Sequence, residues 1–251
     1  LTGLPLPPLS GLLDLPQGSR VETYREGAAA TVAVIGMPDG HRVLRVDGRF
    51  TMGGTASAAA ERRHAHLPLL LHPGPRRVLL LGTGTGITSG AILAHLGLTG
   101  DTVELVPEIA EALPAFASES AFEHWPGRLE LRQADARRFV TTATNRYDVV
   151  VADLFHPGRD GAGGLYTVEH FAALKSRLAP GGICCQWLPL YQLNERTLRC
   201  IVRSYLAVFP EAHAFLLRLD VDTPVLGLIA STSPLRYPAD WLARRGQAPE
   251  L

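Results

Sequence analysis

The sequence predicts an α/β protein with a Rossmann-like doubly wound sheet, which follows a small N-terminal antiparallel β domain. From residue 73 onward, strand-like apolar runs alternate with helix-like segments, and this alternation is typical of a parallel sheet covered by helices. Before that point, two β-prone runs flank Pro38-Asp39-Gly40. This tripeptide indicates a hairpin turn, because proline fixes φ and glycine accepts a left-handed conformation.

We divide the chain into three parts on this basis. Residues 1–18 are rich in Pro, Gly and Leu and form an irregular leader. Residues 19–72 form the β-hairpin domain and a connecting helix, for which we expect a range of about 61–71. Residues 73–251 form the Rossmann-like domain, and Pro73 and Pro75 mark its beginning.

The elements of the large domain follow from local signals. The run Val78–Leu81 is uniformly apolar, as expected of a central strand buried on both faces. Pro107 stands at a first helical position, where its missing N–H is tolerated. Asn194 is a candidate helix cap, with Glu195 near the positive end of the helix dipole. The predicted strands are 78–81, 102–106, 129–131, 148–152, 183–188, 212–217 and 225–230, and the predicted helices are 87–98, 107–116, 165–178 and 194–209.

Composition excludes several classes of protein. The 251 residues carry 24 Lys and Arg against 24 Asp and Glu, and 46% are hydrophobic, which suits a folded domain rather than a disordered chain. Zero net charge argues against a nucleic-acid partner, and no apolar run reaches the ~18 residues of a membrane span. Three cysteines without a CxxC motif favour a reduced, cytoplasmic location. The chain begins at Leu1 rather than Met, so we expect preceding segments to be missing.

The first site signal is a glycine loop between a buried strand and a helix. Gly82, Gly84 and Gly86 alternate with threonines, including Thr85. Glycine is needed where the backbone turns sharply and a ligand approaches closely. A dinucleotide fingerprint would place its third glycine at position 87, which is Ile87. The loop therefore favours an adenosyl ligand without a pyrophosphate, and the alternative is a simple tight turn.

Three acidic residues follow three successive strands. Glu104 ends the strand after the glycine loop and can accept hydrogen bonds from both hydroxyls of a ribose. Asp135, followed by Ala136, can accept from an adenine amino group, although it can equally cap the next helix. Asp153 ends a strand where open α/β sheets place reacting groups, and it can orient or deprotonate an attacking amine. The alternative is a polar strand end in a solvent-filled crevice.

Other polar residues favour structural roles. His64, His66 and His72 make a metal site conceivable, but positions 64 and 66 face apart on a helix, so we expect packing and no metal. Cys184 and Cys185 lie on an apolar strand and alternate across its faces, which indicates buried packing rather than a redox pair.

At this point the sequence resembles the spermidine synthase family, the polyamine aminopropyltransferases, as a divergent spermidine-synthase-like member. The resemblance runs from about Tyr24 to Ser231. The segments that carry it are Leu44–Gly48, His66–Leu69, Gly82–Gly86, Val103–Leu105, Gln133–Ala136, Tyr147–Asp153 and Pro180–Leu188.

This resemblance implies a fold like that of S-adenosylmethionine-dependent methyltransferases, behind an N-terminal β domain. It also implies transfer of an aminopropyl group from decarboxylated S-adenosylmethionine to a diamine. By the same resemblance, Glu104 holds the ribose, Asp135 holds the adenine, and Asp153 acts on the nucleophilic amine.

The sequence departs from the family pattern on the acceptor side. The family usually carries an Asp where Thr85 stands, and that Asp recognises the amino group of the donor. The second acid of the family, three positions after the first, is His156 here. A family Gln falls near Thr51, and a family Tyr has no counterpart because Ala58–Ala60 occupies its region. The nucleoside pocket is therefore better supported than the diamine site.

We therefore predict an aminopropyltransferase-like enzyme with a small-molecule amine as acceptor. His156, Trp187 and Tyr191 are the candidates for the acceptor side, with core packing as the alternative for the two aromatic residues. One rival is an S-adenosylmethionine-dependent methyltransferase, since Thr85 would not repel the carboxylate of the full donor. The other is a non-catalytic nucleoside-binding domain. The small β unit cannot bury a core alone, which predicts packing against the main domain or a partner and hence a homodimer.

Overall fold

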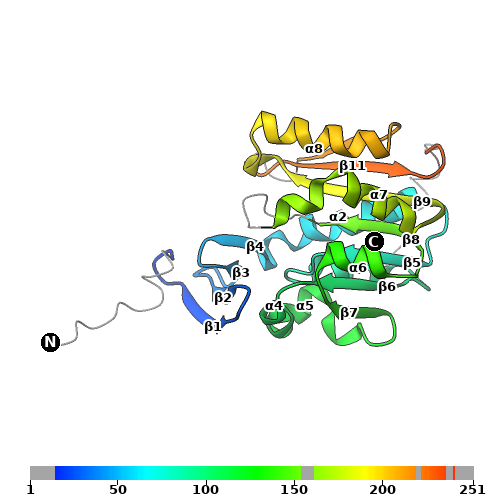
Figure 1. The fold of residues 1–251 in the computed structure, drawn as a ribbon. Coiled ribbons are helices and arrows are strands. Elements are labelled where there is room, and N and C mark those ends of the chain that lie inside the picture. Colours follow the sequence, from blue (N-terminus) through cyan, green and yellow to red (C-terminus); the bar gives the residue numbers. More distant parts are fainter. Residues whose placement is uncertain (1–14, 154–160, 219–221, 236–239, 241–251) are drawn as a thin grey trace, which may run out of the picture.

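Two separate sheets make up the protein (Figure 1). This computed structural model describes residues 15–153, 161–218, 222–235 and 240. The smaller sheet has the strand order β1-β2-β3-β4, and the larger has the order β10-β11-β9-β8-β5-β6-β7. The predicted fold class is therefore confirmed.

The small sheet is an antiparallel meander whose hairpin turn was predicted from Pro38-Asp39-Gly40. Gly40 has φ +86° and donates its N–H to the Met37 carbonyl over 3.0 Å. The strands are β1 (Arg20–Glu26), β2 (Thr31–Gly36), β3 (Arg42–Val46) and β4 (Phe50–Gly54).

The apolar face of the small sheet is completed by the large domain. Val34 and Leu44 are fully buried against Ile109 and Phe116, which lie in and just after helix α4 (Pro107–Ala112). The sheet therefore packs against its own main domain, which is one of the two arrangements that its size predicted.

The large sheet has five parallel strands followed by an antiparallel pair. Strand β5 pairs in parallel with both β6 and β8, and β11 runs antiparallel to both β9 and β10. The strands are β5 (Arg77–Leu81), β6 (Thr99–Glu104), β7 (Leu129–Gln133), β8 (Tyr147–Ala152), β9 (Leu178–Pro189), β10 (His213–Leu217) and β11 (Val225–Ser231).

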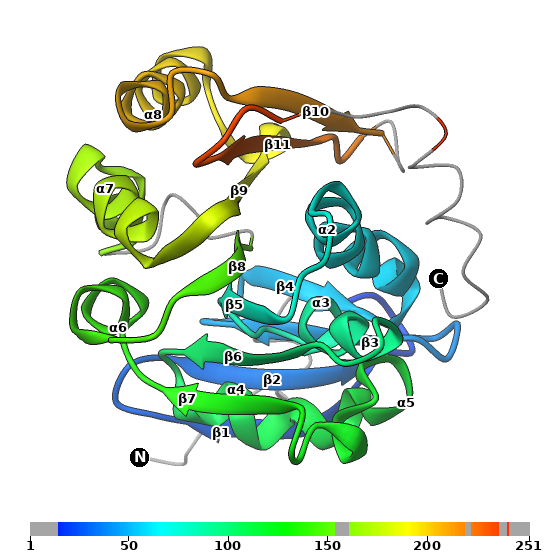
Figure 2. The same ribbon diagram turned by 90° about the vertical axis from the view of Figure 1, so that its right-hand side faces the viewer.

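Helices cover both faces of this sheet (Figure 2). On one face lie α2 (Ala58–Leu71) and α3 (Ile87–Gly90), and on the other lie α6 (Ala136–Thr142), α7 (Val168–Arg177) and α8 (Glu195–Val208). The remaining short helices are α5 (Ala117–Ser120) and the 3₁₀ turns η1 (Thr55–Ser57), η2 (Ala91–Ala94), η3 (Leu113–Phe116), η4 (Phe122–His124), η5 (Ala162–Tyr166) and η6 (Leu190–Gln192). No helix within the described ranges is long and apolar enough to cross a membrane.

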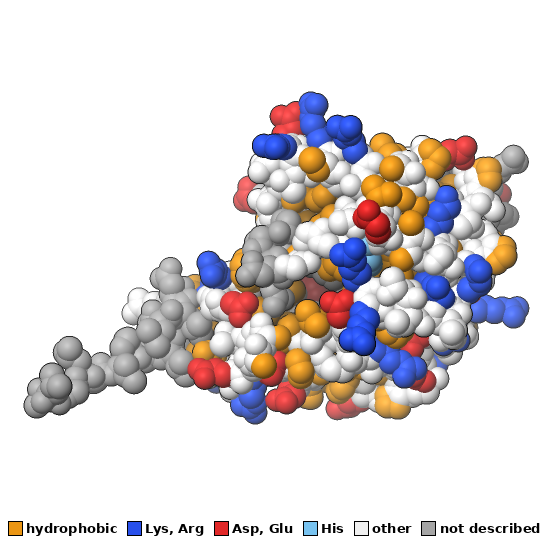
Figure 3. All heavy atoms as spheres, viewed as in Figure 1, with side chains coloured by type: hydrophobic (Ala, Val, Ile, Leu, Met, Phe, Trp, Pro, Cys, Tyr) orange, Lys and Arg blue, Asp and Glu red, His pale blue; other side chains and the backbone are white. Residues whose placement is uncertain are grey.

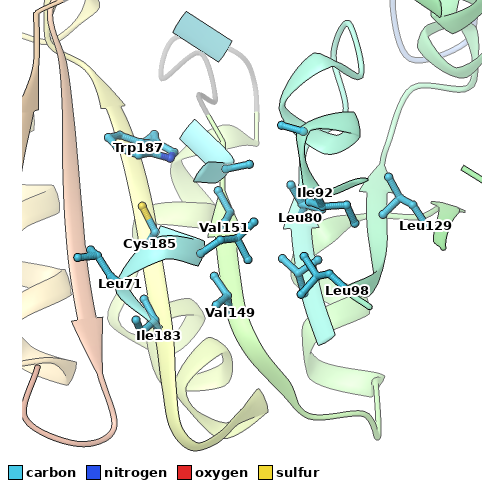
Figure 4. Packing of buried hydrophobic residues seen from close by; sticks show 14 of the residues in the cluster. Leu71, Leu80, Ile92, Leu98, Leu129, Val149, Val151, Ile183, Cys185 and Trp187 are labelled. Carbon is cyan, nitrogen blue, oxygen red and sulfur yellow. The ribbon is translucent and has the colours of Figure 1, made fainter. Parts of the chain in front are cut away.

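Each face of the sheet has its own apolar core. Figure 4 shows Val149, Val151 and Ile183 on the same side of the sheet as Leu71 of α2. Cys185 belongs to this core, whereas Cys184 belongs to the core under α7 and α8. The predicted alternation of the two cysteines across the sheet is therefore confirmed.

Some element boundaries differ from the prediction because tertiary contacts decide them. The helix expected over 87–98 ends as α3 at Gly90, where a Cβ would lie 1.7 Å from the Ser120 carbonyl oxygen. Strand β6 begins at Thr99 rather than at 102, since Thr99 pairs with Arg77 of β5. Strand β9 begins at Leu178 rather than at 183, so it includes Gly181 and Gly182, which the sequence predicted to lie before the strand.

Candidate active site

The candidate site lies where the strand order of the large sheet reverses, at the carboxyl ends of β5, β6 and β8. The Gly82 N–H donates to the Val103 carbonyl over 2.9 Å, and the Asp153 N–H donates to the Leu81 carbonyl over 3.0 Å. These bonds hold the segments that follow the three strands side by side. Open α/β sheets bind ligands at such an edge, because the chain diverges there and leaves a crevice.

The glycine loop requires glycine for two reasons. Gly82, Gly84 and Gly86 have φ values of +88°, +51° and +78°, in the left-handed region that side chains disfavour. Gly86 directly precedes α3, and a Cβ there would lie 2.8 Å from Leu113 Cδ2 and 3.2 Å from Trp125 Cζ2. The loop is therefore a close-packed backbone turn whose N–H groups remain near the strand ends.

A chain of buried hydroxyls anchors the loop from beneath. Thr83 Oγ1 and Ser89 Oγ each lie 2.9 Å from Thr102 Oγ1, and all three residues are buried. Because each hydroxyl can both donate and accept, the chain satisfies these polar groups inside the domain. The Thr83 side chain therefore points into the domain.

Glu104 lies against the glycine loop, where the sequence placed it. Its Oε2 accepts hydrogen bonds from the N–H groups of Thr83 (3.0 Å) and Gly84 (3.4 Å), and its Oε1 accepts from Val106 (2.9 Å). A carboxylate has about four acceptor positions, so one remains for a ligand. The neighbouring Leu105 leaves 53% of its surface exposed, which supplies an apolar face beside the carboxylate.

Asp135 caps helix α6 in this structure. Its Oδ1 accepts from the Arg138 N–H over 2.7 Å, and Ala136 is the first residue of the helix. The capping alternative is therefore observed, and the exposed carboxylate stands at the end of β7, next to β6 in the sheet. The Ala134 N–H donates to the Glu104 carbonyl over 2.9 Å, so the ends of the two strands are tied together.

Asp153 lies beside His64, for which the sequence favoured a packing role over metal binding. Its Oδ1 is 3.3 Å from His64 Nδ1, in a contact without hydrogen-bond geometry, and 20% of the aspartate side chain is exposed. His64 belongs to α2, and its ring lies 4.9 Å from that of Trp187. The Trp187 Nε1–H donates to the His64 carbonyl over 2.9 Å. Trp187 is fully buried, so it packs against His64 and does not line the surface of the site, as the core-packing alternative predicted.

Of the other two acceptor-side candidates, the structure describes Tyr191 but not His156. Tyr191 is 47% exposed, and burial raises the pKa of its hydroxyl, as does the charge of Asp153. The side chain of Tyr191 therefore lies within electrostatic reach of Asp153. His156 lies outside the described residues.

The histidines of α2 face apart, as predicted. His66 Nδ1 lies 3.0 Å from His95 Nε2, whereas His64 turns to Asp153. In the part of the chain that the structure describes, no group of three or more His, Cys, Asp or Glu side chains could hold a metal ion.

The structure adds one residue that the sequence analysis missed. Glu61 of α2 accepts a 2.5 Å hydrogen bond from the Thr85 hydroxyl through Oε2. Its Oε1 accepts from Ser57 Oγ (2.6 Å) and from the Gly54 N–H (3.0 Å). Burial raises the pKa of the Glu61 carboxyl against the effect of these bonds, and Asp153 raises it further. One signal in the sequence could have indicated Glu61. Thr85 stands where the family usually has an Asp, so a carboxylate from another segment could take the place of that Asp.

The site is therefore acidic. The face in Figure 3 is hollowed between the small sheet and the large domain, and acidic side chains are visible in and beside the hollow. The carboxylates of Glu104 and Glu61 both contact the glycine loop, and Asp153 is close enough to Glu61 to raise its pKa. Such an arrangement favours a cationic ligand whose neutral part lies along the loop.

Comparison with known proteins agrees with this geometry. The family profile described as "Spermine/spermidine synthase domain" matches residues 59–219. A polyamine aminopropyltransferase 2 of Hyperthermus butylicus is 31% identical over 191 residues, which cover 74% of this chain and 60% of that protein. The polyamine aminopropyltransferase 2 of Pseudomonas aeruginosa is 29% identical over 182 residues, covering 69% and 51%. The chain thus spans about half to three-fifths of the length of these curated relatives.

Solved structures show the same fold. A crystal structure of spermidine synthase in complex with the transition state analogue AdoDATO superimposes with a TM-score of 0.77 at 21% identity, covering 90% of this chain and 84% of that one. The spermidine synthase from Thermotoga maritima gives a TM-score of 0.75 at 21% identity, covering 90% and 83%. The family profile matches well over half of the chain, and the solved structures share its fold over 90% of its length. The chain therefore belongs to the spermine/spermidine synthase family.

Proposed function

We propose that this protein transfers an aminopropyl group from decarboxylated S-adenosylmethionine to a small amine. The observation that carries the proposal is the placement of Glu104 and Asp153 on either side of the glycine loop, at one edge of the sheet. The names of the curated relatives, polyamine aminopropyltransferases, support the same activity.

The nucleoside would lie across the ends of β5, β6 and β7. Glu104, already fixed by three backbone N–H groups, would accept a hydrogen bond from a ribose hydroxyl at its remaining acceptor position. Leu105 would cover a face of the adenine, and Asp135 would accept from its amino group. Because Glu104 is held in place before the ligand arrives, little ordering cost is added on binding.

Asp153 would act on the acceptor. The nitrogen of a neutral amine attacks the aminopropyl carbon that is bonded to the sulfonium. A C–N bond forms, the C–S bond breaks with its electron pair going to sulfur, and 5′-methylthioadenosine leaves as a neutral thioether. Asp153 would orient the amine and take up the proton that the new ammonium releases. Alignment of amine and sulfonium in one site accounts for much of the rate.

The test measures 5′-methylthioadenosine formed by the full chain from decarboxylated S-adenosylmethionine and a panel of diamines. Asp153→Asn should lower turnover by about 100-fold or more while donor binding, measured by calorimetry, stays close to that of the unchanged protein. Asp39→Asn, at an exposed turn of the small sheet, is the matched control and should keep full turnover. Full turnover by Asp153→Asn would contradict the role given to Asp153.

The same assay separates the two rival functions. Formation of S-adenosylhomocysteine from S-adenosylmethionine would identify a methyltransferase. Tight nucleoside binding without product from any amine would identify a non-catalytic binding domain. Either outcome would overturn the proposal.

We also propose that the protein forms a homodimer and acts in the cytoplasm. On the face of the small sheet opposite α4, the partly buried Val21, Tyr24 and Met37 surround the buried Ile35, and the exposed parts of these three side chains suit contact with a second subunit. The free cysteines among the described residues agree with a reducing compartment. Light scattering of the purified chain would test the dimer, and a monomer at micromolar concentration would contradict it.

A further inference from the structure

Glu61 is a carboxylate with an open acceptor position inside the proposed site. Its oxygens accept from Ser57, Gly54 and Thr85, which fills three of about four acceptor positions and leaves one on Oε2. Within the part of the chain that the structure describes, no lysine or arginine forms an ion pair with it. A half-buried carboxylate that has an open acceptor position and no cationic partner is stabilised most by binding a cation.

The surrounding backbone is shaped to hold this carboxylate in place. Gly53 has φ +116°, and a Cβ there would lie 2.5 Å from Glu61 Oε1. Thr85 Oγ1 accepts from the Ile87 N–H (3.4 Å), which directs the hydroxyl hydrogen toward Glu61. Thr88 Oγ1 donates to the Glu61 carbonyl over 3.2 Å and ties α2 to α3. The carboxylate is therefore fixed against the glycine loop at Thr85.

The neighbours of Glu61 define what kind of cation fits. Asp153 is close enough to influence its charge, so the space between them carries negative potential from both carboxylates. His64, 3% exposed, presents Nδ1 to Asp153 from the same helix, without hydrogen-bond geometry. A primary ammonium has three donors and suits such a position, whereas a group carrying its own carboxylate would be repelled.

We propose that Glu61 binds the terminal ammonium of the donor's aminopropyl arm and thereby selects the decarboxylated donor over S-adenosylmethionine. This inference rests on the proposed function, because the arm lies between the glycine loop and Asp153 only if the sulfonium is the reacting centre. Glu61 takes no part in proton transfer. It positions the arm by an ion pair and excludes the extra carboxylate of the full donor by repulsion.

The experiment is calorimetric titration of the full chain with three nucleosides. 5′-Methylthioadenosine has no ammonium arm, the decarboxylated donor has the arm, and S-adenosylmethionine has the arm and a carboxylate. The unchanged protein should bind the decarboxylated donor at least about tenfold more tightly than S-adenosylmethionine, because the extra carboxylate of the full donor is repelled by the carboxylates of Glu61 and Asp153.

Glu61→Gln keeps the shape of the side chain and removes its charge. The preference for the decarboxylated donor should fall by about tenfold, while the affinity for 5′-methylthioadenosine stays unchanged and shows that the site is folded. Glu111→Gln is the matched control, since Glu111 is an exposed residue of α4 whose side chain forms an ion pair with Arg25 on the surface. It should keep both the affinities and the preference of the unchanged protein.

The outcomes distinguish this inference from the proposed function. If Glu61→Gln keeps the donor preference of the unchanged protein, Glu61 does not select the donor, whether or not aminopropyl transfer occurs. If the unchanged protein binds none of the three nucleosides, the proposed function fails and takes this inference with it. A parallel loss of affinity for all three nucleosides in Glu61→Gln would assign Glu61 a structural role only and overturn its part in selection.

Discussion

His170 should make the protein sensitive to mild acid, because the folded state buries its neutral ring. The residue lies in α7, is 1% exposed, and neither of its ring nitrogens has a hydrogen-bond partner among the described residues. Burial and, to a smaller extent, the charge of Arg137 lower the pKa of His170 to about 4, against the opposing charge of Asp135.

The sign and size of the effect follow from proton linkage. Below about pH 6.5 the unfolded chain binds a proton at this histidine while the folded chain does not, so stability falls as the pH falls. The gap between the two pKa values corresponds to about 3 kcal/mol of unfolding free energy, which is lost between about pH 6.5 and pH 4. About 2 kcal/mol of it should already be lost at pH 5.

The variant His170→Phe removes the titrating group and keeps an aromatic ring of similar size. Urea unfolding at pH 8 and at pH 5 gives the free energy of unfolding of both proteins. The stability of the variant relative to the unchanged protein should rise by about 2 kcal/mol between pH 8 and pH 5. His124→Gln, at an exposed histidine, controls for the loss of a surface imidazole. A relative stability that is the same at both pH values would refute the burial of a neutral His170.

Three further changes test the packing of the site. Gly86→Ala should destabilise the protein by about 1–3 kcal/mol and weaken nucleoside binding, because the new methyl group meets Leu113 at a positive φ; unchanged melting would contradict this. Trp187→Phe should cost about 1–3 kcal/mol, since the His64 carbonyl loses its buried donor, and should also lower turnover if His64 supports Asp153. Asp135→Ala should cost about 1 kcal/mol through loss of the α6 cap, and nucleoside affinity should fall as well; unaltered affinity would leave Asp135 with the cap alone.

Much of the fold could be read from local patterns. The apolar run of β5 and the cap at Asn194 depend only on neighbouring residues, and Asn194 Oδ1 does accept from the Thr197 N–H over 2.8 Å. The end of α3 could not be predicted, because Gly90 makes room for the Ser120 carbonyl, a contact between segments distant in sequence.

The same distinction separates the site residues. Glu104 was predictable because its distance from the glycine loop is set by the strand–helix–strand unit that joins them. Glu61 and His64 were not, since both come from a helix before the first strand of the large sheet and reach the site only through packing. Their chemistry depends on Thr85 and Asp153, and no local periodicity connects α2 to either residue.

The shared core of the small sheet and α4 has a consequence for synthesis of the chain. The strands β2 and β3 emerge from the ribosome about 60–80 residues ahead of Ile109 and Phe116, which cover their apolar face. At translation rates of about 5–20 residues per second, this face remains uncovered for about 3–16 s. Until then, the apolar face that carries Val34 and Leu44 lacks its partners from the large domain. The first strands to be made are therefore among the last to be stabilised, and slower elongation between β3 and α4 would prolong their exposure to chaperones and to aggregation.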